Sequence, residues 1–168
     1  KMPAEDITLK ATYTPDTFNA TFDADGGEWA DGTTEQKIPT VFDTPITTPA
    51  TNPEKDGYEF GGWVDENGKT PDEMTEEGMD FTAVWVPVDQ EVLVKIYLMD
   101  TDGTYPTTPD DETSVTFKTE ETATVVPDGI KNYTVDAEKS VLEAVVAADG
   151  STELKIYYAL DKTTISFD

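Results

Sequence analysis

Residues 57–63, Gly-Tyr-Glu-Phe-Gly-Gly-Trp, constrain the fold of this chain more than any other stretch, because aromatic residues are densest there. Tyr58 and Phe60 are two positions apart, so on a β-strand their side chains point to the same face. Trp63 lies three positions further on, and a β-bulge at the Gly61-Gly62 pair would turn it to that face as well. The stretch therefore predicts a core strand whose three rings enter one hydrophobic core. We favour this over a surface platform on which a ligand stacks.

The charge of the chain excludes several classes of partner. Its 168 residues include 36 acidic and 11 basic side chains, a net charge of −25. Binding to phosphate needs a basic footprint, so we expect no nucleic-acid partner and no anionic membrane surface. No run approaches the roughly 18 apolar residues of a membrane-spanning helix, so we also expect no membrane insertion.

The missing residue types argue against catalysis. The sequence contains no histidine and no cysteine, so it has no Ser-His-Asp triad, thiol nucleophile, zinc finger or disulfide. Gly26-Gly27 and Gly61-Gly62 lack the Gly-Lys-Thr pattern of a phosphate-binding loop. Paired carboxylates such as Glu76-Glu77 are common in so acidic a chain, and each module is too small to enclose a sugar cleft. We expect no catalytic residues and no cofactor.

Calcium is the metal that the pattern brings into consideration. Asp100, Asp102 and Asp111 stand at the first, third and twelfth positions of a possible EF-hand loop. Glycine falls fourth in that loop and not sixth, and the last ligand is aspartate and not glutamate, so the EF-hand pattern fails. Asp-x-Asp-Gly more often forms a plain turn. We therefore expect no metal site and keep these three aspartates as weak candidates.

An internal repeat indicates how the chain is organised. Residues 2–13 align without gaps on residues 74–85, and each segment ends on an aromatic residue with a proline two positions beyond. The predicted parts are the last strand of a preceding repeat (1–15), a first module (16–87), a second module (88–161) and the first strand of a following repeat (162–168). Net charges of −14 over 16–87 and −11 over 88–161 agree with two similar modules. The short joints, none rich in Gly or Ser, predict an elongated rod.

Alternating apolar residues and turn signals predict the strands of the first module. They are residues 18–22, followed by a turn at 23–27, then 36–42 with Ile38 and Val41 inward, 58–64, and 79–86. The segment 44–57 carries three prolines, which predicts an irregular crossing. Thr70-Pro71-Asp72-Glu73 resembles a helix start, with Gly78 as the stop, and predicts a helix of about two turns.

The second module is predicted to hold a central strand at 92–98, because its residues are apolar on both faces. Further predicted strands are 114–118, 124–126, 133–135 and 153–158. Residues 141–146 fit either a capped helix or the first arm of a hairpin before the Asp149-Gly150 turn. We favour the hairpin.

Three motifs in order, residues 22–27, 57–63 and 81–85, resemble the Listeria–Bacteroides repeat, a family that includes the B-repeats of listerial internalins. The resemblance covers about residues 17–86. It implies a small β-grasp-like module in a secreted or wall-attached bacterial surface protein, and it carries over no catalytic residue. Residues 102–105, 149–151 and 155–158 resemble, more weakly, mucin-binding-protein-like repeats.

Together these observations predict a mainly β protein, α+β at most, of two small antiparallel or mixed β modules in tandem. The leading function is the repeat region of an adhesin outside the cell, on a bacterial surface, serving as a stalk or presenting modules to a host ligand. Its partners would be neighbouring repeats and a host protein or glycan. The alternative is a carbohydrate- or protein-binding accessory module of an extracellular enzyme. That alternative needs exposed aromatic rings, for which the candidates are Trp29, Tyr97, Tyr105 and Tyr157.

Overall fold

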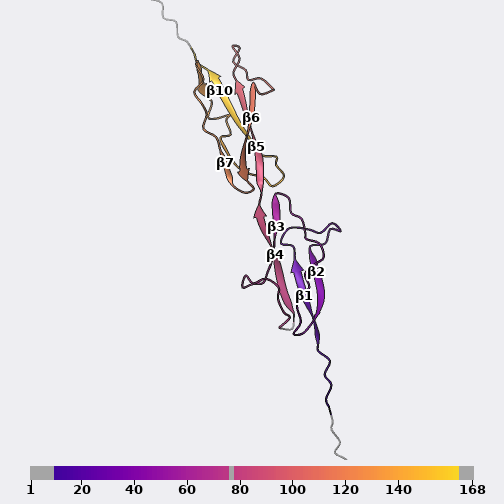
Figure 1. The fold of residues 1–168 in the computed structure, drawn as a ribbon. Coiled ribbons are helices and arrows are strands. Elements are labelled where there is room, and N and C mark those ends of the chain that lie inside the picture. The colour runs from indigo at the N-terminus through magenta and orange to yellow at the C-terminus, as the bar shows by residue number, and fades with distance from the viewer. Residues whose placement is uncertain (1–9, 76–77, 163–168) are drawn as a thin grey trace, which may run out of the picture. The chain divides into compact units, whose positions relative to one another are not determined.

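The computed structural model describes residues 10–75 and 78–162, and over these ranges it contains strands and no helix (Figure 1). This confirms the prediction of a mainly β protein. The strands are β1 (Thr17–Asp23), β2 (Glu35–Val41), β3 (Tyr58–Val64), β4 (Met79–Pro87), β5 (Asp89–Leu98), β6 (Asp111–Lys118), β7 (Thr122–Thr124), β8 (Tyr133–Val135), β9 (Glu143–Val145) and β10 (Glu153–Leu160). No helix in the described ranges is long and apolar enough to cross a membrane.

The chain divides into two compact units. Unit 1 comprises Lys1–Pro53 and Gly62–Val84, and unit 2 comprises Glu54–Gly61 and Trp85–Asp168. The boundary passes through β3, whose first half belongs to unit 2 and whose second half belongs to unit 1. A short segment of the predicted first module is therefore part of the second packing unit.

The sheet of unit 1 has the strand order β2-β1-β4-β3. β1 pairs antiparallel with β2 along its whole length and parallel with β4. Every second residue of β1 faces the core, so Ala20 and Phe22 are fully buried, and Phe81 of β4 stacks on Phe22 with a centroid distance of 5.3 Å. Thr40 is the buried residue near the end of β2, and Val41 is 38% exposed, so the inward assignment of Val41 was wrong.

The sheet of unit 2 has the order β6-β5-β10-β8. β5 pairs antiparallel with β6 and parallel with β10, and β10 pairs antiparallel with β8. The predicted central position of β5 is confirmed. When the four strands of each sheet are numbered in chain order, both sheets have the same spatial order: second, first, fourth, third.

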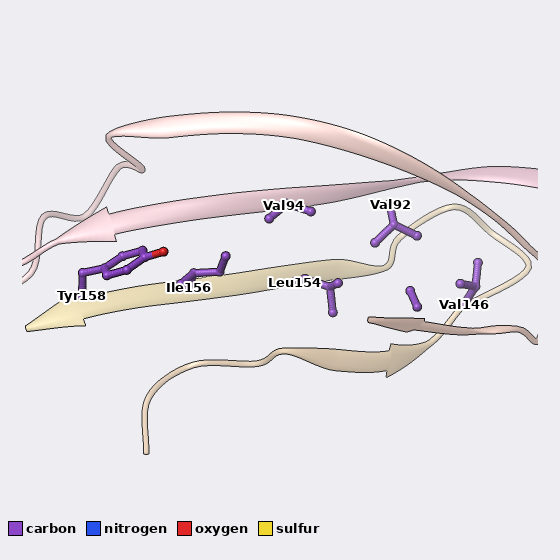
Figure 2. Packing of buried hydrophobic residues seen from close by; sticks show 7 residues of the cluster. Val92, Val94, Val146, Leu154, Ile156 and Tyr158 are labelled. Carbon is purple, nitrogen blue, oxygen red and sulfur yellow. The ribbon is translucent and has the colours of Figure 1, made fainter. Parts of the chain in front are cut away.

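The core of unit 2 lies on one face of this sheet, where β5 and β10 run side by side (Figure 2). Figure 2 shows Leu154, Ile156 and Tyr158 spaced along β10, with Val92 and Val94 on β5 beside them. The small sheet of β7 and β9 contributes Ala123, and Val146 directly after β9 joins the same cluster.

The predicted helix between Thr70 and Gly78 was wrong. Its described residues, 70–75 and 78, are not helical, and residues 76–77 lie outside the described ranges. Met74 donates from its N–H to the carbonyl of Thr44 and accepts from Asp43, while its side chain is fully buried. Burial of Met74 and these long-range backbone hydrogen bonds stabilise the observed conformation more than the local capping signal stabilises a helix, because such local preferences are weak.

The three rings predicted to enter one core, those of Tyr58, Phe60 and Trp63, are divided between the two units. Trp63 is 5% exposed and belongs to unit 1, where its ring meets Phe22 edge to face at 5.1 Å. Tyr58 and Phe60 are half-buried in unit 2. The Phe60 ring meets Trp85 of β4 edge to face at 5.7 Å, and Trp85 alternates with the exposed residues of β4 on the same face as Phe81. Phe60 and Trp63 therefore point to the same face, as the predicted bulge at Gly61-Gly62 required, and Gly62 has a φ of 123°.

Residues 141–146 contain the strand β9 and no helix, but its pairing differs from the predicted hairpin. β9 pairs antiparallel with β7, and a single bridge between Val141 and Lys155 connects this segment to β10. The predicted strands at the ends of the chain fall largely outside the described residues. These are 1–9 of the segment 1–15, whose residues 10–15 form no strand, and 163–168 of the segment 162–168.

Candidate functional site

Three of the four candidate aromatic residues come together on unit 2. Tyr97 of β5 and Tyr157 of β10 are register partners, because the two strands pair in parallel. Their rings stack at 4.6 Å with an interplanar angle of 10°, and the Tyr105 ring meets Tyr157 edge to face at 5.0 Å. These tyrosines lie on the sheet face opposite Leu154 and Ile156, since side chains alternate along a strand. We call Tyr97, Tyr105 and Tyr157 the tyrosine cluster.

Charged groups hold the outer member of the tyrosine cluster in place. The Tyr105 hydroxyl donates to Oδ2 of Asp136 at 2.9 Å, and the ammonium of Lys139 lies 4.9 Å from the centre of the Tyr105 ring. Burial, together with the hydrogen bond to the Asp136 carboxylate, raises the pKa of Tyr105 to about 12. Tyr105 therefore remains a neutral hydroxyl at physiological pH.

The tyrosine cluster is a packed feature with little free ring surface. Tyr97 is 8% exposed, and the Tyr97 and Tyr157 rings cover one face of each other. A sugar-binding platform needs an open aromatic face, so this arrangement is better suited to closing the outer side of the sheet.

Trp29, the fourth candidate, lies in unit 1 and is 4% exposed. Its ring stacks on Trp63 at 5.9 Å, and its Nε1 donates to the carbonyl of Thr51 at 2.8 Å. Both the ring face and the polar atom of Trp29 are therefore engaged within its own unit.

The candidate calcium ligands form turn contacts. Oδ1 of Asp102 accepts from both the N–H and the hydroxyl of Thr104, which lowers the pKa of Asp102 below its usual value. Asp100 closes the same turn through its backbone, and Oδ1 of Asp111 accepts from the N–H of Glu112 at the start of β6. Within residues 10–75 and 78–162, no group of three or more Asp and Glu side chains is placed to hold a metal ion.

The hollows on each unit are open and acidic. One of about 280 Å³ in unit 1 is lined by residues 65–67 and 78–80. One of about 570 Å³ in unit 2 is lined by Pro87, Asp89 and residues 116–121. Enclosed, largely apolar pockets are typical of small-molecule and catalytic sites, and these two differ from them.

An ion-pair group lies on the outer face of the second sheet. The Lys95 ammonium of β5 donates to Oε1 of Glu153 on β10 and lies 4.0 Å from Oε2 of Glu112 on β6. Lys155 bonds the other oxygen of Glu153 at 3.1 Å. The hydrogen bond from Lys95, reinforced by Lys155, lowers the pKa of Glu153, and Glu153 raises the pKa of Lys95.

The contacts of the segment Glu54–Gly61 within unit 2 were not predicted from the sequence. The Gly57 carbonyl accepts from the Thr119 hydroxyl at 2.8 Å and from the Val88 N–H at 3.1 Å, and Thr119 is 2% exposed. Lys55 lies over the rings of Tyr58 and Trp85. The Asp56-Gly57 turn signal was visible in the sequence, but nothing local to it indicates Thr119, which is 62 positions away.

Comparison with known proteins bears on the first half of the chain. Residues 18–84 match the Listeria-Bacteroides repeat domain, as the resemblance had implied. Internalin H of Listeria monocytogenes is 45% identical over 65 residues, which are 39% of this chain and 10% of that protein. The chain thus spans about a tenth of the length of this relative. The similarity of residues 88–161 to mucin-binding-protein-like repeats stays a prediction.

Proposed function

We propose that this chain is part of the tandem repeat region of a bacterial cell-surface adhesin and acts outside the cell without catalysis of its own. The observation that carries the proposal is the match of residues 18–84 to the Listeria-Bacteroides repeat domain. The similarity to Internalin H, a protein ten times longer than the matched segment, fits a repeat within a longer exported chain.

The architecture supports a structural or interaction role. Both units are small β sheets with the same strand order, and the cores are filled by side chains. The hollows on the two units are open to solvent, unlike the enclosed pockets that are typical of catalytic sites.

Two roles fit such modules: a spacer that holds other domains away from the wall, and a surface that presents a host protein or glycan ligand. The internal use of the aromatic rings favours the spacer. Trp29 stacks on Trp63, and Tyr97 stacks on Tyr157, so neither stacked ring pair offers an open platform. The same observation weighs against the accessory sugar-binding module of an enzyme.

Replacement in the full-length protein separates these roles. Residues 10–162 would be exchanged, in the source bacterium, for an unrelated β-repeat segment of the same length, and attachment to host cells would be measured. A spacer predicts that attachment is retained, whereas a ligand-presenting segment predicts that it is lost. Antibodies against residues 10–162 should label intact cells, and absence of labelling on cells that express the protein would contradict a surface location.

A further inference from the structure

The edges of the two four-stranded sheets differ in how open they are to another strand. Edge strands present unpaired backbone groups, and proteins usually protect them with proline, bulges or short length. β2 carries Pro39, β3 contains Gly61-Gly62 with a φ of 123° at Gly62, and β8 has three residues. β6 has eight residues, neither proline nor glycine, and is exposed at all positions except Phe117. Among the described sheet edges, β6 is the least protected.

The hydrogen-bonding register shows which groups of β6 point outward. The Thr119 N–H donates to the carbonyl of Val88, its register partner just beyond β5 and β6. Hydrogen-bonded and non-hydrogen-bonded pairs alternate in an antiparallel ladder. The N–H and C=O groups of Phe117, Val115 and Thr113 therefore face β5, and those of the even-numbered residues face away.

Two of these outward positions are already capped. The N–H and C=O of Lys118 bond the side chain and backbone of Glu121, and the N–H of Glu112 bonds the Asp111 carboxylate. Between them, Ser114 and Thr116 have outward backbone groups for which the described residues supply no partner. Val115 lies between these two residues and is the register partner of the fully buried Val92 on β5. Its side chain is therefore on the core face, yet Val115 is 38% exposed. The open edge is thus a short window with an incompletely covered apolar residue at its centre.

We propose that this window binds the same window of a second copy of the chain, with the two β6 strands antiparallel about Val115. In that register Ser114 of each copy opposes Thr116 of the other, which forms four backbone hydrogen bonds. The two Val115 side chains face each other as a non-hydrogen-bonded pair and extend the core that Val92 belongs to. A two-fold interface of this kind requires a self-complementary surface, and β6 is one.

Charge complementarity selects this register. The charged residues of β6 are Asp111, Glu112 and Lys118. Pairing about Val115 brings the Glu112 side chain of each copy toward the Lys118 side chain of the other, beyond the ends of the window and on the same face of the joined sheet. The net charge of −25 on each copy opposes association, but at physiological salt the screening length is about 8 Å, so neighbouring charges dominate distant ones. The contact is small, so we expect a weak, transient dimer that strengthens where many copies are held close together.

Disulfide trapping tests the pairing, because the chain contains no cysteine. In a non-hydrogen-bonded antiparallel pair the two Cβ atoms are about 4.5–5.5 Å apart, close enough for a disulfide after a small adjustment. Val115→Cys should form a dimer under mild oxidation. Val41→Cys is the matched control, since Val41 is also 38% exposed and lies on the edge strand that carries Pro39. We expect Val115→Cys to cross-link about tenfold faster, and rates within about twofold of each other would overturn the proposal.

Charge exchange tests the register in the Val115→Cys background. Glu112→Lys alone and Lys118→Glu alone should each slow cross-linking, because like charges then oppose each other. An equimolar mixture of these two variants should restore the rate as a heterodimer. Absence of that rescue would overturn the register.

Within one chain, Glu112 approaches Lys95, and Lys118 pairs with Asp89, so the charge exchanges could also affect folding. A second variant controls for this. Thr116→Pro removes an outward N–H that the fold does not use. In the Val115→Cys background it should abolish cross-linking while the far-ultraviolet circular dichroism spectrum is retained. Unchanged cross-linking in folded Thr116→Pro protein would overturn the proposal.

Discussion

The carbonyl of Gly57 accepts a hydrogen bond from the buried hydroxyl of Thr119 across 62 residues of sequence. A side chain at position 57 would have no room. A Cβ built there lies 2.8 Å from Cα and Cβ of Ala148 and from Oγ1 of Thr119, and Gly57 has a φ of 75°. Glycine is therefore required both by the backbone conformation and by the close approach of neighbouring atoms.

We predict that Gly57→Ala destabilises unit 2 by about 2–4 kcal/mol, through overpacking and the left-handed backbone together. Gly103→Ala is the matched control, since Gly103 has a φ of 85° and nothing within 4 Å of its Cβ. It should cost only the backbone contribution, about 1–2 kcal/mol. Chemical denaturation measures both variants, and equal losses would mean that the packing around Gly57 is unimportant.

The Trp63 ring closes the core of unit 1 between Phe22 and Trp29. We predict that Trp63→Ala costs about 3–5 kcal/mol, as other large-to-small core substitutions do. A domain of this size has little more stability than that to lose, so the unit should be largely unfolded at 37 °C. Val41→Ala, at an exposed position of the same unit, should shift the melting temperature little. A melting temperature for Trp63→Ala near that of the parent would contradict the assignment.

Added salt should stabilise the chain by screening the repulsion among its charges. At matched ionic strength, sodium chloride and calcium chloride should raise the melting temperature alike, since Oδ1 of Asp102 already accepts two hydrogen bonds from Thr104. The measurement is thermal unfolding across a series of both salts. A rise at sub-millimolar calcium that disappears in Asp102→Asn would instead identify a calcium site.

The ion pairs of Glu153 predict a specific pH dependence. Lys95 and Lys155 hold the pKa of Glu153 below its usual value, so the folded state favours the carboxylate. The resulting stabilisation is present above the unfolded-state pKa and is lost as the pH falls through the lower folded-state pKa. Because these groups are partly exposed, we expect Glu153→Gln to cost about 1 kcal/mol or less at pH 7.

The control for that measurement is Glu91→Gln on the exposed part of β5, which removes the same charge without removing a Glu153 contact. Urea unfolding at pH 7 and pH 3 compares the two. The difference between Glu153→Gln and Glu91→Gln should be larger at pH 7 than at pH 3, because protonation of Glu153 weakens its ion pairs. A difference that does not decrease as the pH is lowered would show that the side chain acts through packing and not through charge.

Strands were predictable where a local pattern decides them. Alternation identified β1, and the aromatic run identified β3 with its observed ends, since both signals lie within seven residues. The false helix at residues 70–78 came from a valid capping signal. It failed because Met74 is drawn into the core and its backbone bonds to residues 43 and 44, which local sequence does not encode.

The candidate sites show the same limit. The sequence indicated three candidate exposed rings on unit 2, those of Tyr97, Tyr105 and Tyr157. Their mutual packing could not be predicted, because the stacking of Tyr97 on Tyr157 depends on the parallel register of β5 and β10. Thr119 and Gly57 gave no local sign of their contact. The openness of β6 likewise depends on which strand stands at the edge of the sheet, and sequence alone did not reveal that order.

The parallel pairing of the first and last strands in each unit has a mechanical consequence. In unit 1 these strands are β1 and β4, and in unit 2 they are β5 and β10. Neighbouring strands that run in the same direction place the entry and the exit of the chain at opposite ends of the sheet. Tension applied to the ends therefore pulls the two strands past each other, along their length. The inter-strand hydrogen bonds then share the load and must break together. Each unit therefore resists extension because it is loaded in shear.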